Sequence, residues 1–224
     1  MNFNIPFFFA WICLIRVVCL NAQDRAISQK AWQEAGHPYI QNFSPQDYNG
    51  EIQNFAIVQD KRGVLFFGNN VGVLSYDGVS WKSIATPGRT AVRSLCLVDD
   101  RIYVGAIGDM GYLEPDTAGQ LNYVSILSDL PEENRDFKDV YDTFAFGDAV
   151  YFRTRYYMIR WANGRVRVWK SPREFRRAFV VNNAFYIIQS ETGLFRMTGD
   201  SLRLVPGGDI FARMDVRMML PYDN

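Results

Sequence analysis

Short apolar runs alternate with turn-forming residues along most of the chain, and the clearest example lies between Gln53 and Ile84. Four runs rich in β-branched and aromatic residues occur there, at residues 54–58, 64–67, 73–76 and 81–84. Polar or glycine-containing turns separate them. Runs of this kind are typical of strands joined by tight hairpin turns. The pattern therefore predicts a four-stranded antiparallel meander.

The same arrangement recurs three more times along the chain. In each unit the third predicted strand begins near a landmark position, and these positions are Gly72, Gly111, Tyr157 and Gly193, spaced by 39, 46 and 36 residues. Turn residues recur before the second strand of each unit, at Arg62-Gly63, Asp99-Asp100, Gly147-Asp148 and Asn182-Asn183. Four-stranded units with a period near 40 residues are typical of a β-propeller. No helical period competes, and residues 131–142 are predicted to be an inserted loop or a single turn.

The predicted fold is thus all-β, a propeller of four-stranded antiparallel blades with about four blades in this chain. Blade 1 spans residues 48–85, blade 2 residues 86–126, blade 3 residues 127–170 and blade 4 residues 171–206. Residues 207–224 are predicted to begin a fifth blade, whose first strand runs over residues 216–220. An unpaired fifth strand favours an N-terminal fragment of a longer protein over a complete four-bladed propeller.

The N-terminus is predicted to be an export signal over residues 1–22. Residues 7–15 form an unbroken apolar run, and Ala22 offers a small residue at a cleavage point. No basic residue precedes the run and Arg16 interrupts it, so an uncleaved signal anchor is the alternative. Residues 23–47 form a polar lead-in that ends in a short strand over residues 39–42. The remainder is expected to lie in the periplasm or on the cell surface.

Composition narrows the possible chemistry. The formal net charge is zero, so no global field attracts the chain to nucleic acid. His37 is the only histidine, and it supports neither a metal site nor a catalytic triad. Cys13 and Cys19 lie inside the signal, which leaves Cys96 without an intrachain partner. We expect no metal, no cofactor and no nucleic-acid partner.

One segment is strongly basic. Nine Lys or Arg residues and a single acid, Glu174, lie between Arg153 and Arg177. Arg165 and Arg167 alternate with valines, so both are expected on one face of a strand. One interpretation is a solvated outer face that blocks edge pairing, and the other is a surface that binds anions or a partner. Separately, most of the aromatic residues at strand positions, a set that includes Trp81, are predicted to pack between blades. The set is Phe55, Phe66, Phe67, Tyr76, Trp81, Tyr103, Tyr112, Trp161 and Trp169.

The first two units resemble the bacterial two-component regulator propellers. The residues that carry this resemblance are 36–43, 53–63, 68–70 and 72–81 in the first unit, and 92–95, 102–105 and 111–113 in the second. The resemblance fades after Asp136. It implies an extracytoplasmic sensor propeller followed by a β-sandwich, a membrane helix and a cytoplasmic output module, either a histidine kinase or a helix-turn-helix DNA-binding domain.

Candidate ligand-binding residues lie in two kinds of loop, between the second and third strands of a blade and between consecutive blades. They are Asn69, Asn70, Arg89, Asp109, Arg153, Arg155 and Glu191. Amide, carboxylate and guanidinium groups suit sugars, and arginine suits acidic sugars. Each residue has an alternative role as a turn former or a solvated surface group.

Three functions remain open. The first is a ligand-sensing or interaction propeller at the N-terminal part of a membrane-bound signal-transduction regulator, with no enzymatic activity in this chain. The second is an exported propeller enzyme acting on polysaccharide, for which Asp109, Asp136 and Glu191 are available carboxylates. The third is a structural scaffold. The partners expected are a glycan or another small polar ligand, the downstream domains of the full protein, and a second copy in a homodimer.

Overall fold

The computed structural model describes residues 40–222. The predicted signal at residues 1–22, His37 and Tyr39 lie outside the described residues. The chain divides into two units, residues 1–42 and 43–224. In the first unit only residues 40–42 are described, and they carry no strand, so the short strand predicted over residues 39–42 is not found in that part. The second unit contains every element discussed below.

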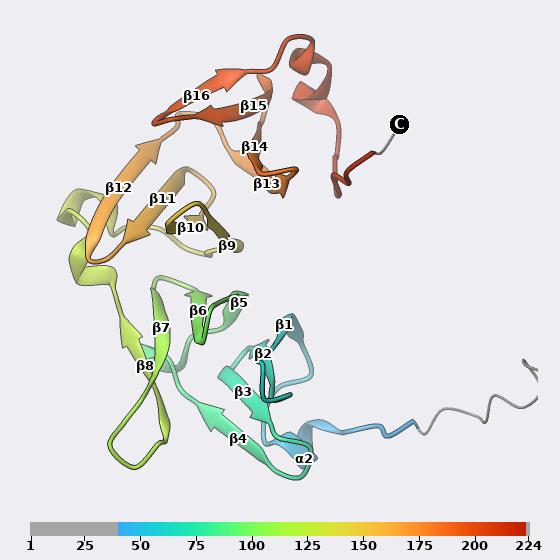
Figure 1. Ribbon diagram of the computed structural model, residues 1–224, viewed down its shortest axis with the longest axis vertical. Helices are drawn as coiled ribbons and strands as arrows, with labels where there is room; N and C mark the ends of the chain where they lie inside the picture. The colour runs from blue at the N-terminus through green and yellow to red at the C-terminus, as the bar shows by residue number, and fades with distance from the viewer. Residues whose placement is uncertain (1–39, 223–224) are drawn as a thin grey trace, which may run out of the picture. The chain divides into compact units, whose positions relative to one another are not determined.

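Four antiparallel sheets of four strands each make up the described part of the second unit, and strands adjacent in sequence are adjacent in each sheet (Figure 1). Blade 1 contains β1 (Asn54–Gln59), β2 (Leu65–Asn69), β3 (Gly72–Tyr76) and β4 (Trp81–Ile84). Blade 2 contains β5 (Val92–Val98), β6 (Arg101–Ala106), β7 (Met110–Pro115) and β8 (Leu121–Ser125). Blade 3 contains β9 (Asp142–Phe146), β10 (Ala149–Arg153), β11 (Tyr157–Ala162) and β12 (Arg165–Lys170). Blade 4 contains β13 (Phe175–Val181), β14 (Ala184–Gln189), β15 (Gly193–Thr198) and β16 (Ser201–Leu204). The predicted β-propeller architecture of about four blades is confirmed.

The predicted hairpin turns adopt the left-handed backbone that such turns require. Gly63 has a φ of 86° and Gly147 has a φ of 62°. Asp99 and Asn182, at the equivalent turns of blades 2 and 4, have φ values of 52° and 48°. Since glycine and the short Asn and Asp side chains tolerate this region, local sequence was sufficient to place these turns.

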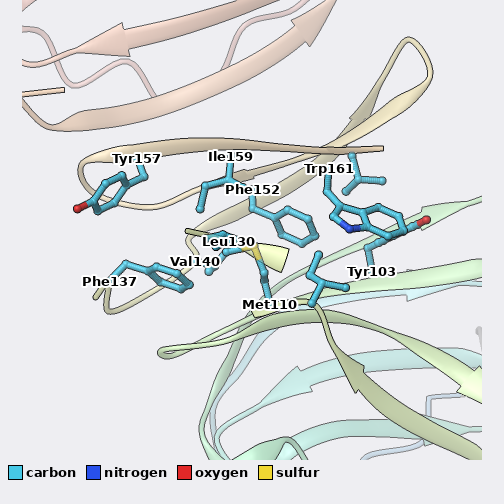
Figure 2. Packing of buried hydrophobic residues seen from close by; sticks show 11 residues of the cluster. Tyr103, Met110, Leu130, Phe137, Val140, Phe152, Tyr157, Ile159 and Trp161 are labelled. Carbon is cyan, nitrogen blue, oxygen red and sulfur yellow. The ribbon is translucent and has the colours of Figure 1, made fainter. Parts of the chain in front are cut away.

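Adjacent blades are joined by three apolar clusters. Between blades 1 and 2 the cluster includes Phe66, Val73, Ile84, Val92, Val104 and Leu113. Between blades 2 and 3 it includes Tyr103, Met110, Leu130, Phe137, Val140, Phe152, Tyr157, Ile159 and Trp161 (Figure 2). Between blades 3 and 4 it includes Tyr151, Met158, Phe175, Phe185, Ile187 and Met197. Each inner blade therefore buries apolar side chains on both faces of its sheet.

Trp81 does not pack between blades, contrary to the prediction. Its ring stacks on Tyr76 with a centroid distance of 4.6 Å, and it also contacts the rings of Phe43, Tyr48 and Phe67. Tyr76 is its partner across the β3–β4 pair, and such partners lie on the same face of a sheet. That face is opposite to the one that carries the apolar cluster shared with blade 2. The lead-in, including α2 (Pro45–Tyr48), covers it.

The segment after blade 4 also differs from the prediction. Residues 214–222 form no strand, although residues 216–220 were predicted to begin a fifth blade. Instead, a 3₁₀ helix, η4 (Gly208–Arg213), packs on β15. A strand requires a hydrogen-bonded neighbour, and no described strand pairs with this segment. The predicted loop at residues 131–142 is confirmed. It contains one 3₁₀ turn, η3 (Glu132–Asn134), and an isolated bridge from Asp139 to Ile107, and its last residue, Asp142, begins β9.

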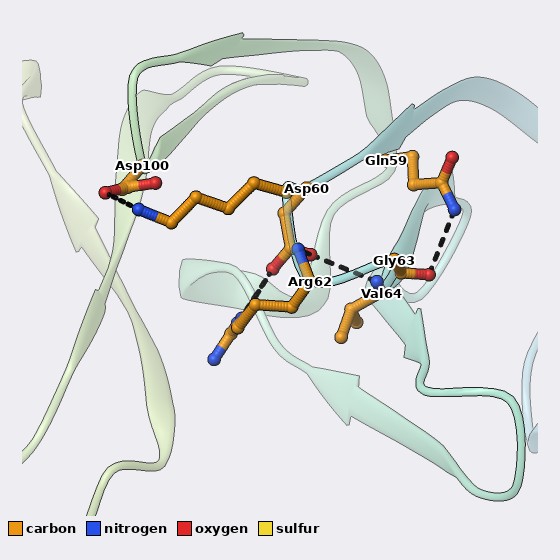
Figure 3. Close-up of polar contacts among 7 residues, drawn as sticks. Gln59, Asp60, Arg62, Gly63, Val64 and Asp100 are labelled. Atoms are coloured by element: carbon orange, nitrogen blue, oxygen red, sulfur yellow. Dashed lines mark hydrogen bonds and ion pairs between the residues drawn. The ribbon is translucent and has the colours of Figure 1, made fainter.

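The β1–β2 turn of blade 1 is held by its own polar groups (Figure 3). The Asp60 Oδ1 atom accepts hydrogen bonds from the backbone amides of Arg62 and Val64, at 2.9 and 3.0 Å. Lys61 Nζ lies 2.6 Å from Asp100 Oδ2, in the equivalent turn of blade 2. Both side chains of this pair are largely exposed, so the ion pair contributes only about 0–1 kcal/mol. Apolar burial, not this contact, holds the two blades together.

No helix within residues 40–222 is long and apolar enough to cross a membrane.

Candidate functional site

The loops predicted to bind a ligand share one edge of the blades, because backbone hydrogen bonds join them. The amide of Gly108, in the β6–β7 loop, donates to the Lys138 carbonyl at 2.8 Å. The amide of Phe175 donates to the Arg155 carbonyl, and the amide of Ser190 to the Glu174 carbonyl, both at 2.8 Å. The β6–β7 and β10–β11 loops are thus bonded to the segments that enter the next blades, and the β14–β15 loop is bonded to the segment that enters its own blade. The scaffold at this edge is formed by backbone, and side chains project from it.

Asn69 lies at this edge but is fully buried. Its Oδ1 accepts hydrogen bonds from the amides of Glu51 and Val71, at 3.0 and 3.2 Å. Its Nδ2 donates to the Glu51 carbonyl at 2.7 Å, to the Gln53 carbonyl at 3.1 Å and to Asn54 Oδ1 at 2.8 Å. Four of these contacts tie residues 51–54, at the start of β1, to the end of β2, and the fifth closes the β2–β3 turn. Asn69 therefore has a structural role here, and its burial does not favour ligand contact.

Asp109 is also buried, with its side chain turned into blade 2. Its Oδ1 accepts hydrogen bonds from the Met110 amide and from Ser125 Oγ, both at 2.7 Å. Burial raises the pKa of the Asp109 carboxyl, and the two hydrogen bonds offset part of that rise. The neighbouring Tyr123 hydroxyl is buried without a hydrogen-bond partner among the described residues. Its pKa is raised by burial and by the negative charge of Asp109.

Three further predicted residues lie in turns or connections and do not line the cleft described in the next paragraph. Asn70 is half-buried in the β2–β3 turn. Arg89 is exposed in the connection between blades 1 and 2, with a φ of 53°. Glu191 has a φ of 61°, and its carboxylate forms an ion pair with Arg173. The structure does not bring these three side chains into one site.

Arg153 and Arg155, by contrast, line a common cleft at the edge where blades 3 and 4 meet. The cleft has a volume of about 420 Å³. It is lined by Tyr141, Arg153, Arg155, Glu174, Phe175, Arg176, Arg177, Ile188, Met214, Asp215 and Val216. Its volume falls within the range of roughly 300–1,000 Å³ that small-molecule sites occupy. We therefore take this cleft as the candidate binding site.

Arg153 is fixed at the base of the cleft and is only 3% exposed. Its Nε donates to Asp142 Oδ2 at 2.5 Å, and one terminal nitrogen donates to the Phe175 carbonyl at 2.6 Å. The guanidinium carbon lies 5.1 Å from the centroid of the Tyr141 ring, a cation–π geometry. The other terminal nitrogen has no hydrogen-bond partner within residues 40–222. The base of the cleft thus presents a rigid donor that remains available.

The other charged groups of the cleft are more exposed. Arg155 Nε donates to Glu174 Oε1 at 2.6 Å. Arg176 donates to the Met214 carbonyl at 3.1 Å and lies 3.8 Å from Asp215 Oδ1. Arg177 is exposed and has no ion-pair partner in the described part of the chain. Four arginines therefore meet three carboxylates, Glu174 and Asp215 on the lining and Asp142 at the Arg153 guanidinium, which leaves one positive charge in excess.

Much of the basic segment is neutralised by acids from elsewhere in the fold. Ion pairs join Arg153 to Asp142, Arg155 to Glu174, Arg160 to Asp148, Arg167 to Asp200, Arg173 to Glu191 and Arg176 to Asp215. Arg165 and Arg167 are exposed while Val166 and Val168 are half-buried, which confirms the predicted alternation. The predicted basic surface is therefore largely a set of ion pairs. Within residues 40–222, Arg165, Lys170 and Arg177 have no ion-pair partner, and of these three Arg177 lines the cleft.

Sequence reasoning did not select Tyr141, Arg176 or Asp215. Tyr141 follows the long inserted loop, Arg176 lies in β13 and Asp215 lies after η4. Only Arg176 carried a signal, as a member of the basic segment. The other two approach the cleft only when blades 3 and 4 pack together.

A larger groove, with a volume of about 860 Å³, lies between blades 1 and 2. None of the predicted site residues lines it. Its acidic groups are already engaged, since Asp77 caps its own turn by accepting from the amides of Val79 and Ser80 at 2.9 and 2.7 Å. Asp60 and Asp100 are bound within the turns described above. The carboxylates of this groove are therefore already engaged within the protein.

A scan of protein-family models finds no match to this sequence. A search of curated proteins finds no relative. Among solved structures, the chain resembles the WD40 β-propeller domain of Doa1, with a TM-score of 0.50 and 14% identity over 68% of this chain and 54% of that one.

The chain is also similar to the extracellular domain of the one-component system BT4673 from B. thetaiotaomicron, with a TM-score of 0.49 and 18% identity over 65% of this chain and 20% of that one. A third similar structure is virginiamycin B lyase from Staphylococcus aureus, with a TM-score of 0.49 and 14% identity over 71% of this chain and 56% of that one. This chain thus spans about a fifth of the BT4673 domain. At these identities the likenesses concern the fold alone, and the Doa1 match supports a β-propeller.

Proposed function

We propose that this chain is the ligand-binding propeller of an extracytoplasmic sensor and forms the N-terminal part of a membrane-bound signal-transduction regulator. The observation that carries the proposal is the cleft between blades 3 and 4, where four arginines and Tyr141 converge at the loop edge of a propeller. The apolar N-terminal run and the resemblance of the first two units to two-component regulator propellers add support.

The alternative of a polysaccharide-cleaving enzyme has less support. Glycoside hydrolysis requires two carboxyl groups placed on either side of the scissile bond. The acids that line the cleft are Glu174 and Asp215, and each forms an ion pair with an arginine. Asp109, one of the predicted carboxylates, is buried, accepts hydrogen bonds from Ser125 and the Met110 amide, and does not line the cleft.

Export and ligand binding are tested separately. Fusion of the full chain to a phosphatase that is active only outside the cytoplasm is expected to give phosphatase activity, and a fusion lacking residues 1–22 to give none. Activity that does not depend on residues 1–22 would contradict export by this signal. Reading the gene beyond the codon for Asn224 is expected to reveal a membrane helix and an output module, and an immediate stop codon would exclude the regulator.

Ligand binding is tested by a thermal-shift screen of the full chain against neutral and acidic oligosaccharides, amino acids and nucleosides. A concentration-dependent rise in melting temperature with at least one class is expected, because binding to the native state stabilises it by mass action. A chain that is exported but shows no rise with any class would overturn ligand sensing and favour a scaffold.

A further inference from the structure

The geometry of the cleft between blades 3 and 4 points to the class of ligand. We propose that this cleft binds a carboxylate-bearing saccharide, with arginines holding the carboxylate and Tyr141 lying against the sugar ring. The inference rests on the proposed ligand-binding function and narrows it to one chemistry.

The first argument is the excess of arginine. Arg153, Arg155, Arg176 and Arg177 line the cleft against Glu174 and Asp215. Planar guanidinium groups match a carboxylate with two parallel hydrogen bonds, which an ammonium group cannot do. The segment between Arg153 and Arg177 contains one lysine, Lys170, and it does not line the cleft. The basic groups of the cleft are therefore all guanidinium groups. Arg153, Arg155 and Arg176 already donate to protein groups, whereas Arg177 has no ion-pair partner in the described part of the chain and is free to bind a carboxylate with two hydrogen bonds.

The second argument is that the site already holds a carboxylate of the protein itself. Asp215 lies 3.8 Å from an Arg176 terminal nitrogen and 2.7 Å from one of Arg217. Its side chain is 54% exposed, so it can be displaced without unfolding the blade. The carboxylate of a ligand would replace Asp215 at Arg176. It would also pair with Arg177, the next residue of β13.

The third argument separates a saccharide from a simple anion. Tyr141 lines the cleft and remains 44% exposed, although it is a large aromatic residue next to a buried charge. The guanidinium carbon of Arg153 lies over the Tyr141 ring, 5.1 Å from its centroid, and this contact helps to fix the position of the ring. An exposed, fixed aromatic ring beside polar donors offers apolar contact to the C–H face of a sugar, which phosphate or citrate does not need.

The test uses calorimetry on the full chain with a panel of uronate oligosaccharides and the same oligosaccharides after reduction of each carboxyl group to an alcohol. Binding of at least one uronate is expected, with its reduced counterpart about tenfold weaker or worse. Equal affinity for both forms would overturn the inference. So would binding of neutral glycans alone, an outcome that leaves the proposed sensor function intact. Failure of every ligand class would reject both.

The variants test the site with a matched control. Arg177→Ala is expected to weaken uronate binding about tenfold, because it removes a charged donor that has no structural partner. Arg165→Ala removes the same charge from β12, outside the cleft, and is expected to change the affinity less than twofold. An equal loss in both variants would show general charge attraction and contradict the site.

Two further variants distinguish the contacts. Asp215→Asn is expected to increase uronate affinity severalfold, because it removes the competing internal carboxylate. Tyr141→Ala is expected to weaken binding of the uronate. The binding of citrate and inorganic phosphate, measured by their competition with the uronate, is expected to stay unchanged. If citrate or phosphate displaces the uronate at comparable concentrations, and Tyr141→Ala has no effect, the cleft is a simple anion site and the saccharide inference is wrong.

Discussion

At the scale of single residues, the predicted ligand residues divide into buried and accessible groups. Asn69 and Asp109 both occupy the predicted loop edge, but their side chains turn inward and are satisfied by neighbouring backbone and hydroxyl groups. Arg153 is buried as deeply, yet it still presents one terminal nitrogen at a cleft. Burial alone therefore does not decide whether a side chain can bind a ligand. What decides it is whether the side chain has a donor or acceptor that is not already bonded to the protein.

Asn69 should stabilise the junction between residues 51–54 and β2. Asn69→Ala removes five hydrogen bonds, among them those of the Glu51 amide, the Val71 amide and the Gln53 carbonyl. The Glu51 carbonyl keeps its hydrogen bond from the Tyr48 hydroxyl. We expect a loss of about 1–3 kcal/mol in the free energy of unfolding, measured by urea denaturation. The neighbouring half-buried Asn70 serves as a control, and Asn70→Ala is expected to change stability by less than ~0.5 kcal/mol. Similar small effects in both variants would contradict the structural role of Asn69.

A comparison of Gly72 with Gly78 separates the effect of backbone conformation on stability from the effect of steric crowding. Its φ is 130°, and a Cβ atom at this position would lie 2.5 Å from the Ile84 carbonyl oxygen. Gly78 has a φ of 95°, with no atom within 4 Å of the same position. Both Gly→Ala variants should lose ~1–3 kcal/mol from backbone strain, and Gly72→Ala should lose more because of the contact with Ile84. Equal losses in urea denaturation would argue against the close approach of the two segments.

Asp109 should make stability depend on pH. Its folded pKa lies above the ordinary value, so the folded state holds the proton more tightly than the unfolded state does. Stability must therefore fall as pH rises from ~3.9 through the raised folded pKa, at about 1.4 kcal/mol for each unit of pKa difference. In Asp109→Asn, the amide oxygen can still accept from Met110 and Ser125, and this dependence should vanish. The difference in unfolding free energy between the two proteins, followed from pH 3.5 to 7, measures it. A constant difference would contradict the raised pKa.

At the scale of elements, the two faces of blade 1 have different partners. Phe66 points into the cluster shared with blade 2, while Phe67, its neighbour in β2, contacts Trp81 on the opposite face. The aromatic side chains of the lead-in, Phe43 and Tyr48, cover that second face. Residues 43–48 therefore pack on blade 1 through aromatic contacts with Trp81 and Tyr76.

Removal of the Trp81 ring should loosen the lead-in more than the propeller. Trp81→Ala deletes aromatic contacts worth about 0.5–1.5 kcal/mol each, and limited proteolysis should then cut within residues 43–53. Phe152→Ala, in the core between blades 2 and 3, should lose about 3–5 kcal/mol in urea denaturation without selective cleavage of the lead-in. If Trp81→Ala is destabilised as much as Phe152→Ala and shows no cleavage there, Trp81 belongs to the main core after all.

The strands and hairpin turns could be predicted from the sequence because their causes are local. Alternating apolar residues set the strands, and Gly63 or Asn182 set the turns between them. The face on which Trp81 packs could not be predicted, because it depends on docking of the lead-in. The cleft could not be predicted either, since Tyr141, Arg153 and Asp215 lie far apart in the sequence. Residues 216–220 have the apolar pattern of a strand, but a pattern without a neighbouring strand does not make one.

At the scale of the whole second unit, the free energy of unfolding should depend on the contacts between consecutive blades. Each of the three apolar clusters joins two consecutive blades, and no cluster within residues 40–222 joins more than two. In repeat proteins of this kind, stability is close to a sum of the repeats and their nearest-neighbour interfaces. Substitutions in different clusters should therefore act independently.

This independence can be measured with one double-mutant cycle. Ile102 lies in the cluster between blades 1 and 2, and Ile187 lies in the cluster between blades 3 and 4. Each Ile→Val variant should lose about 0.5–1.5 kcal/mol in urea denaturation, and the double variant should lose their sum to within ~0.5 kcal/mol. A pair within one cluster, Ile159→Val with Phe152→Leu, serves as the contrast and should depart from additivity because the two side chains share neighbours. Coupling between Ile102 and Ile187 as large as in that pair would show that strain passes across both inner blades, and the nearest-neighbour description would then be wrong.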